Sequence, residues 1–300
     1  VCTACSSGAN AIGQAFEDIK DGKLDAALCG AAEAQVQKES LWNWNLLKLL
    51  CRENRDPENA AVVILPVPYD GTSTWIKGAD KGPDALLEAS ENMELYDIDT
   101  DAENYLAGIY TSDHIIENSS PEEMAEAVYK NTASWLKKDK MVITIGGEHS
   151  VSIGAIQAYH EKFNDLQVLQ IDAHTDLRQE YEGSRYNHAC VMARVREWCP
   201  FVQVGIRSMD ITEKQYLPDG KVFYARDIRN NKYHDWIAEV CNKLSGKVYI
   251  TIDLDGFDPS VFPSTGTPEP SGLFYHEVMN LIRTVVEKFE VVGFDVVELC

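Results

Sequence analysis

Acidic and imidazole side chains alternate near the middle of the chain, and an acidic pair with the same spacing follows later. Asp172, His174 and Asp176 are spaced two residues apart, and Asp253 and Asp255 repeat this spacing. Residues two apart in an extended chain point to the same side, so each group can converge on one point. Carboxylate oxygen favours ions such as manganese, and imidazole accepts several metals. These segments therefore predict a site for divalent metal.

Two further side chains belong to the same chemistry. His149 lies in the segment Gly-Gly-Glu-His-Ser, and Glu298 follows an apolar run near the end of the chain. Two imidazoles and four aspartates suit two divalent ions. Without cations, the clustered carboxylates would repel one another and some would take up protons. We therefore predict that the metal ligands are His149, Asp172, His174, Asp176, Asp253 and Asp255.

Each motif taken alone has a simpler explanation. A single His or Asp after a strand more often caps a helix or forms a turn, and Asp258-Pro259 is predicted to be such a turn. The pattern Asp-x-His-x-Asp is by itself only moderately specific for metal. Because three such motifs each follow a predicted strand directly, their recurrence favours the metal site.

The elements that must position these motifs alternate between strand and helix from about residue 59 onward. This pattern is typical of a parallel sheet covered on both faces. Function in such a sheet lies outside the carboxyl ends of the strands, where the motifs can meet. Short β-branched runs predict strands at residues 61–65, 141–145, 167–171, 201–206, 247–252 and 291–297. Helices are predicted at residues 120–138, 151–163, 188–198, 235–244 and 275–289.

The segment from about residue 59 to residue 300 resembles the ureohydrolases, the family of arginase, agmatinase and formimidoylglutamase. Besides the metal motifs, Gly-Thr-Pro-Glu-Pro at residues 266–270 and Gly-Ile-Arg-Ser at residues 205–208 match. The resemblance implies an α/β fold, in three α/β/α layers with a mostly parallel eight-stranded sheet. It also implies homo-oligomers and two Mn²⁺ ions per subunit. One ion would be held by His149, Asp172, Asp176 and Asp253, and the other by His174, Asp172, Asp253 and Asp255, with Asp172 and Asp253 bridging.

The implied chemistry is hydrolysis of a guanidinium group. Two metals sharing an oxygen lower the pKa of bound water from about 15.7 to near neutrality, which provides a bridging hydroxide that attacks the central carbon. A carboxylate matches the planar donors of guanidinium, and we assign this contact to Glu298. The resemblance implicates Asp255 in protonating the leaving amine and His188 in a neighbouring proton relay. A structural histidine at the start of a helix is the alternative interpretation of His188.

The substrate is indicated by a loop at residues 181–190, which resembles the corresponding agmatinase loop. It predicts that agmatine and water give putrescine and urea. Asn187 replaces the usual Ser of the family, and Ser264 and Ser271 replace common Gly residues. Arg178 could pair with a substrate carboxylate and favour a guanidino acid, although we prefer a structural or surface ion pair. A guanidino-acid hydrolase, a formimidoylglutamase, an arginase and a non-catalytic truncated or chimeric homologue are the alternatives.

The first residues resemble a different family. Residues 1–13, which include Cys5, and residues 30–34 are similar to the nucleophile region of β-ketoacyl synthases, where the matching Cys accepts an acyl group at a helix N-terminus. Because the other partners of that chemistry are absent from the sequence, we predict a fused fragment at residues 1–38. A linker at 39–58 and the ureohydrolase domain at 59–300 follow. A redox or zinc pair of Cys2 and Cys5, or a structural small-residue helix at residues 7–22, are the alternatives.

The chain stops at Cys300, two residues after Glu298. Members of the resembled family usually continue with a closing helix that packs on the sheet. We therefore expect a truncated domain with exposed apolar sheet surface and with Glu298 on a fraying end.

Composition narrows the class of protein. The 300 residues are 45% hydrophobic and 25% charged, as in soluble globular proteins. A net charge of −21 argues against a nucleic-acid partner and favours a small cationic guanidinium substrate and divalent metals. No apolar run approaches membrane-span length and no signal peptide opens the chain, so we expect a cytoplasmic protein without membrane contact. The eight scattered cysteines are predicted to be reduced thiols.

Overall fold

The computed structural model describes residues 56–98 and 100–300. The predicted fragment at residues 1–38, with Cys5, and nearly all of the predicted linker at 39–58 lie outside the described residues. The domain boundaries therefore stay predictions.

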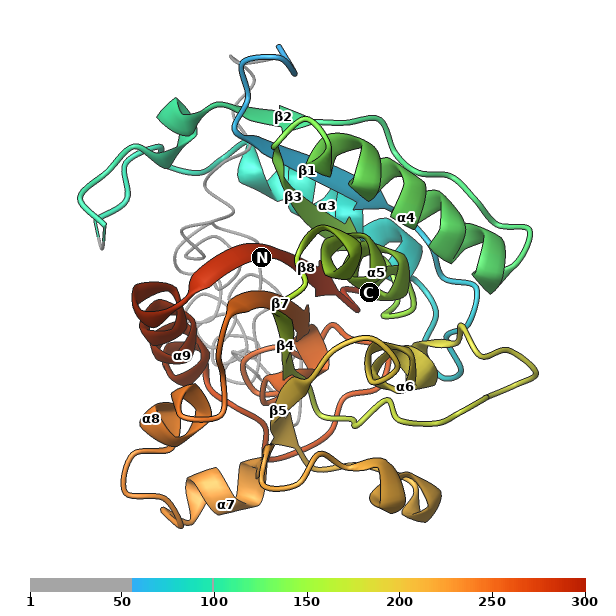
Figure 1. The fold of residues 1–300 in the computed structure, drawn as a ribbon, viewed down its shortest axis with the longest axis vertical. Helices are drawn as coiled ribbons and strands as arrows, with labels where there is room; N and C mark the ends of the chain where they lie inside the picture. Colours follow the sequence, from blue (N-terminus) through green and yellow to red (C-terminus); the bar gives the residue numbers. More distant parts are fainter. Residues whose placement is uncertain (1–55, 99) are drawn as a thin grey trace, which may run out of the picture.

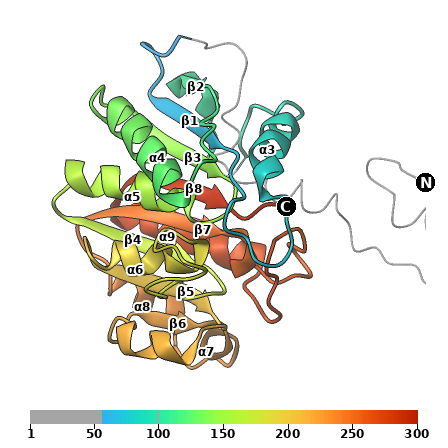
Figure 2. The same cartoon turned by 90° about the vertical axis from the view of Figure 1, so that its right-hand side faces the viewer.

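Within the described residues, eight strands form one sheet in which every neighbouring pair is parallel. Across the sheet the order is β2-β1-β3-β8-β7-β4-β5-β6, which Figure 2 shows from top to bottom. This confirms the predicted fold class, with a sheet that is parallel throughout. The bounds are β1 Val62–Val67, β2 Ile109–Thr111, β3 Met141–Gly146, β4 Leu166–Ile171, β5 Phe201–Ile206, β6 Val222–Tyr224, β7 Lys247–Asp253 and β8 Glu290–Val297.

The described residues also form seven helices. They are α3 Gly82–Ser90, α4 Pro121–Leu136, α5 Val151–Lys162, α6 Val191–Val195, α7 Ala225–Arg229, α8 Trp236–Cys241 and α9 Tyr275–Lys288. The clearest start is that of α4, where the Ser120 side chain accepts a hydrogen bond from the backbone N–H of Glu123 and Pro121 occupies the first turn.

The structure differs from the sequence-based prediction in several places. The single helix predicted at residues 188–198 is wrong, because His188–Cys190 forms a 3-10 turn and Cys190 has non-helical φ and ψ angles before the short helix α6. Helix α8 is shorter than the predicted 235–244. Strands β2 and β6 were not predicted individually, since three residues each are too few to show an alternating pattern.

Helices cover both faces of the sheet, as the alternation of side chains along β7 illustrates. Val248, Ile250 and Ile252 pack in one buried cluster with residues of α3, α8 and α9. Tyr249 packs in a second cluster with residues of α4, α5 and α6. Figure 1 shows α4, α5 and α6 on one side of the sheet and α8 and α9 on the other. Strand β7 is therefore buried by helices on both faces and has apolar side chains on both, as is typical of a strand in a parallel sheet.

The four central strands carry the predicted metal motifs. His149 follows β3, Asp172 follows β4, Asp253 ends β7 and Glu298 follows β8. These strands are neighbours in the order β3-β8-β7-β4. Because all strands run in the same direction, the four motifs meet at one edge of the sheet although 149 positions separate the first from the last.

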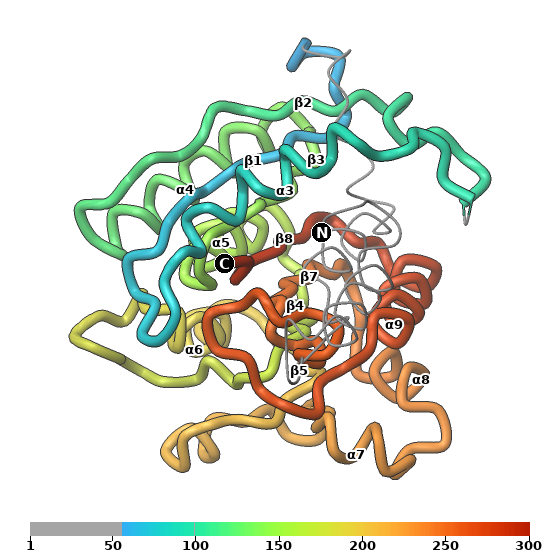
Figure 3. Tube along the Cα trace, turned by 180° about the vertical axis from the view of Figure 1, so that it is seen from behind, coloured from blue at the N-terminus to red at the C-terminus, as the bar shows by residue number. Residues whose placement is uncertain are grey.

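Glu298 is held firmly, contrary to our expectation of a fraying end. Its side chain is buried, and its backbone N–H donates to Gly147 O at 2.7 Å. Leu299 packs against the buried cluster of α9, and Cys300 N donates to Ser264 O at 3.2 Å. Figure 3 shows the end of the chain beside β8 within the fold. Contacts with neighbouring loops therefore fix this segment.

None of the helices formed by residues 56–98 and 100–300 is both long and apolar enough to cross a bilayer. The four cysteines in the described part of the chain, Cys190, Cys199, Cys241 and Cys300, are free thiols.

Helices α4 and α5 approach each other closely at Gly154. A Cβ atom added at Gly154 would lie 2.1 Å from the backbone oxygen of Ala125 in α4. Backbone cannot move aside as a flexible side chain can, so the absence of a side chain at this position sets the distance between the two helices.

We expect Gly154→Ala to lower the thermal unfolding midpoint. Alanine normally stabilises a helix by about 1 kcal/mol relative to glycine, but overpacking here costs about 1–3 kcal/mol. Ser134→Ala, at an exposed position of α4, is the matched control and should leave the midpoint nearly unchanged. A midpoint of Gly154→Ala equal to or above that of the wild type would contradict the close approach.

Candidate metal centre

The glycine pair before Glu148 and His149 places both side chains. Gly147 N donates to Val67 O at 2.8 Å, and Glu148 N donates to Tyr69 O at 2.9 Å. A Cβ added at Gly147 would lie 1.9 Å from Tyr69 O, so only glycine allows the loop after β3 to approach the loop after β1 this closely. His149 is thereby held at the start of α5, with its side chain over the carboxyl ends of the central strands.

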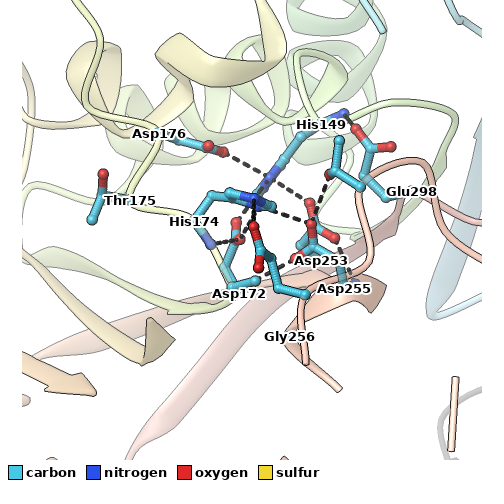
Figure 4. Close-up of polar contacts among 12 residues, drawn as sticks. His149, Asp172, His174, Thr175, Asp176, Asp253, Asp255, Gly256 and Glu298 are labelled. Carbon is cyan, nitrogen blue, oxygen red and sulfur yellow. Dashed lines mark hydrogen bonds and ion pairs between the residues drawn. The ribbon is translucent and has the colours of Figure 1, made fainter. Parts of the chain in front are cut away.

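The segment after β4 presents three ligand-type side chains to the same centre. Figure 4 shows Asp172, His174 and Asp176 turned toward one another and toward His149, whereas Thr175 points away. The Thr175 hydroxyl donates instead to Glu213 Oε1 at 2.8 Å. Asp176 has a φ of 52°, in the left-handed region, which bends the chain at the end of the motif.

Two overlapping groups of side chains can each hold a metal ion. The first is His149 with Asp172 and Asp176, and the second is Asp172 with His174 and Asp255. Within each group the ligand atoms lie within 4.8 Å of one another. Asp172 is common to both groups, which suits a bridging carboxylate.

Distances around the two histidines define this arrangement. Nδ1 of His149 lies 3.2 Å from Asp172 Oδ2, 3.0 Å from Asp176 Oδ2 and 3.1 Å from Asp253 Oδ2. Nδ1 of His174 lies 2.9 Å from Asp255 Oδ2. The structure thus brings together all six predicted ligands, while the metal contacts of each residue, including the second bridge at Asp253, stay predictions.

The orientation of His149 fits a cation. Its Nδ1 is buried and takes part in no hydrogen bond of good geometry, although three carboxylate oxygens surround it. Its Nε2 lies 2.9 Å from the hydroxyl oxygen of Thr251, and Thr251 donates to Asp295 Oδ1 at 2.7 Å. Because the hydroxyl has one proton, Thr251 accepts from Nε2–H, and the lone pair of Nδ1 points at the carboxylates. Lone pairs facing lone pairs are stable only when a cation or a proton lies between them.

The close approach of the buried carboxylates also shifts the pKa values of the aspartates. Burial, and then the charges of Asp176 and Asp255, raise the pKa of Asp172 to about 7. Burial and the charge of Asp255 also raise the pKa of Asp253 well above its ordinary value. Asp255 is the exception, because the nearby His174 outweighs burial and lowers its pKa. Without cations the centre therefore keeps protons that it would exchange for metal.

Burial lowers the pKa of a histidine, whereas it raises the pKa of an aspartate. Burial opposes their charged forms, yet contact with Asp172 and Asp176 raises the pKa of His149 well above its ordinary value. The charge of Asp255 likewise outweighs burial at His174 and raises its pKa. The surroundings of both rings thus favour positive charge, which is what bound dications would supply.

A cavity of about 240 Å³ opens onto this centre. Glu298 lines it and has a φ of 68°, and its Oε1 accepts a hydrogen bond from His149 N at 2.9 Å. Burial, and then the charge of Glu148, raise the pKa of Glu298 well above its ordinary value. His188 also lines the cavity and is half-buried, so it is accessible to a ligand.

Other residues singled out in the sequence have structural contacts. Arg178 lines the cavity, lies over the Tyr181 ring at 4.6 Å and approaches Asp210 Oδ2 at 3.7 Å, which agrees with a structural ion pair. Asn187 caps the turn of His188 by accepting from Ala189 N. Ser271, at a position where the resemblance has glycine, has a φ of 66°.

Sequence reasoning missed the residues that support the ligands. Thr72 contacts His188 and Thr251 contacts His149 through hydrogen bonds, and Asp295 accepts a hydrogen bond from Thr251. None of these three residues belongs to a metal motif. Asp295 carries a recognisable signal, since it is a charged residue inside the apolar strand β8. A buried charge in such a place needs a partner.

Comparisons with known proteins agree with this geometry. A family model described as "Arginase family" matches residues 60–300, and one described as "Beta-ketoacyl synthase, N-terminal domain" matches residues 1–61. N(1)-aminopropylagmatine ureohydrolase of Synechocystis sp. is 38% identical over 80% of this chain and 82% of its own length. Agmatinase of Pyrococcus horikoshii is 32% identical over 81% of this chain and 85% of its own length. The crystal structure of agmatine ureohydrolase of Thermoplasma volcanium has a TM-score of 0.75 and 33% identity, over 84% of this chain and 86% of that one.

We expect Mn²⁺ to raise the thermal midpoint of metal-stripped protein, and to raise it more at about pH 8 than at about pH 5.5. The pKa of Asp172 is about 7 in the folded protein and about 4 in an unfolded chain. The folded state therefore binds the extra proton, and metal-free protein loses stability as pH rises through this window. Bound cations replace that proton. Equal midpoints with and without Mn²⁺ at the higher pH would contradict the site, and Asp172→Asn should remove most of the gain.

We expect Thr251→Val to weaken divalent metal binding by about 10- to 100-fold, because the ring of His149 loses the acceptor that fixes its Nε2–H. Thr132→Val is the matched control, since its buried hydroxyl has no hydrogen-bond partner among the residues that the structure describes. Competition with a metal chelator measures both affinities. An unchanged affinity in Thr251→Val would show that Thr251 does not orient the ligand.

Proposed function

The chain belongs to the arginase family, and on this basis we propose that it hydrolyses the guanidinium group of agmatine or of an N-substituted agmatine, releasing urea. The observation that carries the proposal is the pair of carboxylate–histidine groups sharing Asp172 beside a cavity with a buried glutamate. Metal ligands and a guanidinium acceptor that line the same cavity define a place for the reacting carbon.

Glu298 is the residue suited to bind the guanidinium. Its Oε1 is engaged by the backbone of His149, and Glu298 lines the cavity beside Asp253 and Asp255. A carboxylate and a guanidinium pair through two parallel hydrogen bonds, which orients the planar group as well as attracting it. Removal from water at this buried position strengthens the attraction. Glu298 would therefore hold the central carbon of the substrate next to the metal ligands.

The ligand set fits two divalent cations, and manganese is our proposal for them. His149, Asp172, Asp176 and Asp253 would hold one ion, and His174, Asp172, Asp253 and Asp255 the other. When bound, the ions would supply a hydroxide nucleophile at neutral pH and stabilise the negative charge that develops during attack.

The remaining steps concern protons held by this chain. When the bond between the central carbon and the substituted nitrogen breaks, that nitrogen must gain a proton to leave as an amine. Asp255 faces the cavity and accepts a hydrogen bond from the Thr267 hydroxyl at 3.1 Å. It would guide the proton to the departing nitrogen, and His188, which also lines the cavity, would replenish it.

The second candidate substrate is N(1)-aminopropylagmatine. The relative named for that substrate is 38% identical to this chain, whereas the relative named agmatinase is 32% identical. This difference in identity favours the aminopropyl derivative. Both compounds present the same guanidinium group and differ only at the far end, so the metal chemistry and the role of Glu298 would be identical. Residues of the outer cavity would therefore determine which of the two substrates is preferred.

The test is urea release by protein loaded with Mn²⁺, with agmatine, N(1)-aminopropylagmatine, arginine and guanidinobutyrate as substrates. Formimidoylglutamate is followed by formamide. We expect agmatine or its aminopropyl derivative to be preferred over arginine by about 100-fold or more in kcat/KM. Asp253→Asn preserves the shape of a predicted ligand and should abolish turnover.

Preference for guanidinobutyrate would overturn the proposed substrate and would point to Arg178 as a carboxylate ligand. Lack of turnover of all five compounds by protein shown to hold two metal ions would overturn the catalytic proposal.

A further inference from the structure

We propose that Thr72 and Glu148 act as positioning residues for His188, fixing its proton on Nδ1 and leaving the lone pair of Nε2 free for proton transfer. This inference rests on the proposed function, because it assigns a working atom in the same reaction. It concerns residues that lie outside the metal motifs.

The three side chains come from three different loops at the carboxyl edge of the sheet. Thr72 follows β1, Glu148 follows β3, and His188 begins the 3-10 turn that precedes α6. Thr72 and Glu148 are buried, whereas His188 is half-buried and lines the cavity. The arrangement therefore runs from the interior toward the space where the substrate would lie.

Thr72 lies at the centre of the contacts. Its hydroxyl oxygen is 2.9 Å from Glu148 Oε1, accepts from the backbone N–H of His188 at 2.9 Å, and is 3.1 Å from Nδ1 of the same residue. A hydroxyl has one proton to donate and two lone pairs to accept with. Three neighbours thus account for its full hydrogen-bonding capacity.

Glu148 decides where the hydroxyl proton points. Its carboxylate also accepts from Thr72 N, from Ser150 N and from the Ser150 hydroxyl. Surrounded by donors, the carboxylate takes the Thr72 proton as well. Both lone pairs of Thr72 then remain for His188, so Nδ1 must be a donor and must carry the ring proton.

Nε2 is consequently the unprotonated nitrogen of a neutral His188. Within the described part of the chain, no hydrogen bond engages this atom. The ring of Tyr181 meets the His188 ring edge-on, with centroids 6.2 Å apart and an angle of 85°, which limits rotation of the imidazole. The cavity wall therefore presents a fixed acceptor for a proton.

A similar arrangement of hydrogen bonds holds His149. His149 is held by a threonine whose proton goes to a buried carboxylate, Thr251 to Asp295. There the free lone pair of Nδ1 faces the metal ligands, whereas at His188 the free lone pair is that of Nε2. Two carboxylate–threonine pairs thus set opposite tautomers, each suited to its place.

In the proposed reaction Nε2 of His188 takes up a proton that the attacking water releases and passes it by way of Asp255 to the nitrogen that leaves the guanidinium carbon. The water oxygen forms the new bond to carbon, the bond from carbon to the substituted nitrogen breaks, and that nitrogen gains both protons of the water, so guanidinium and water give neutral urea and an ammonium group. His188 returns to the Nδ1–H form, so its protonation is unchanged over one cycle.

The decisive measurement is the tautomer of His188, read from long-range ¹⁵N–¹H correlations of the wild-type protein with Mg²⁺ in place of paramagnetic Mn²⁺. His188→Asn identifies the signals by their loss. We expect a protonated Nδ1 and an unprotonated Nε2. A protonated Nε2 with an unprotonated Nδ1 in the neutral ring of the wild-type protein would overturn the proposal.

Variants then link the tautomer to turnover. Thr72→Val should lose the Nδ1–H preference and lower kcat by about 10- to 100-fold with KM little changed. Thr72→Ser restores the hydroxyl and should recover both the tautomer and most of the lost kcat. Thr132→Val, remote in α4, is the control for loss of a buried hydroxyl. Wild-type kcat in Thr72→Val, or an equal loss in the Val and Ser variants, would overturn the proposal.

The tautomer is observed without turnover, so it separates this inference from the proposed function. Protein with the expected tautomer but without urea release from any guanidinium compound would overturn the proposed function and leave the positioning of His188 standing.

Discussion

Mutual repulsion among buried carboxylates is the constraint on which the rest of the structure depends. Asp172, Asp253 and Asp255 are buried within a few ångströms of one another, and burying unpaired ions costs several kcal/mol each. Only cations, protons or a dense set of hydrogen-bond donors can offset this cost. The parallel sheet makes the gathering possible, because the carboxyl ends of its four central strands open onto the same edge.

Local backbone geometry and a layer of supporting side chains hold the ligands against that repulsion. Asp176 and Glu298 adopt left-handed φ angles that non-glycine residues rarely take, and such strain is found mostly at functional sites. Behind them, the hydroxyls of Thr251 and Thr72 connect buried carboxylates to the two histidines. Glu148 adjoins His149 in the chain and supports His188 through Thr72, so one loop links the metal ligands with a further residue that lines the cavity.

Local sequence patterns predicted most of the longer strands and helices but not how they are arranged in the sheet. The six longer strands and the helices α4, α5 and α9 follow from β-branched runs, capping residues and spacing within a few positions. The eight-stranded parallel sheet came from family resemblance, since β2 and β6 are too short to show a period of their own. The predicted helix at 188–198 failed because Asn187 and the contacts of His188 with Thr72 favour a tight turn there.

The sequence by itself determined the ligand types and their order, because alternation after a strand places aspartate and histidine side chains together whatever the surroundings. It also determined the family, through motifs that recur after successive strands. Only the tertiary structure decided which strands are neighbours, how firmly Glu298 is held, and which nitrogen of each histidine is free. Those features depend on contacts between residues far apart in the sequence, such as Thr72 with Glu148 and His149 with Glu298, and no local pattern encodes such contacts.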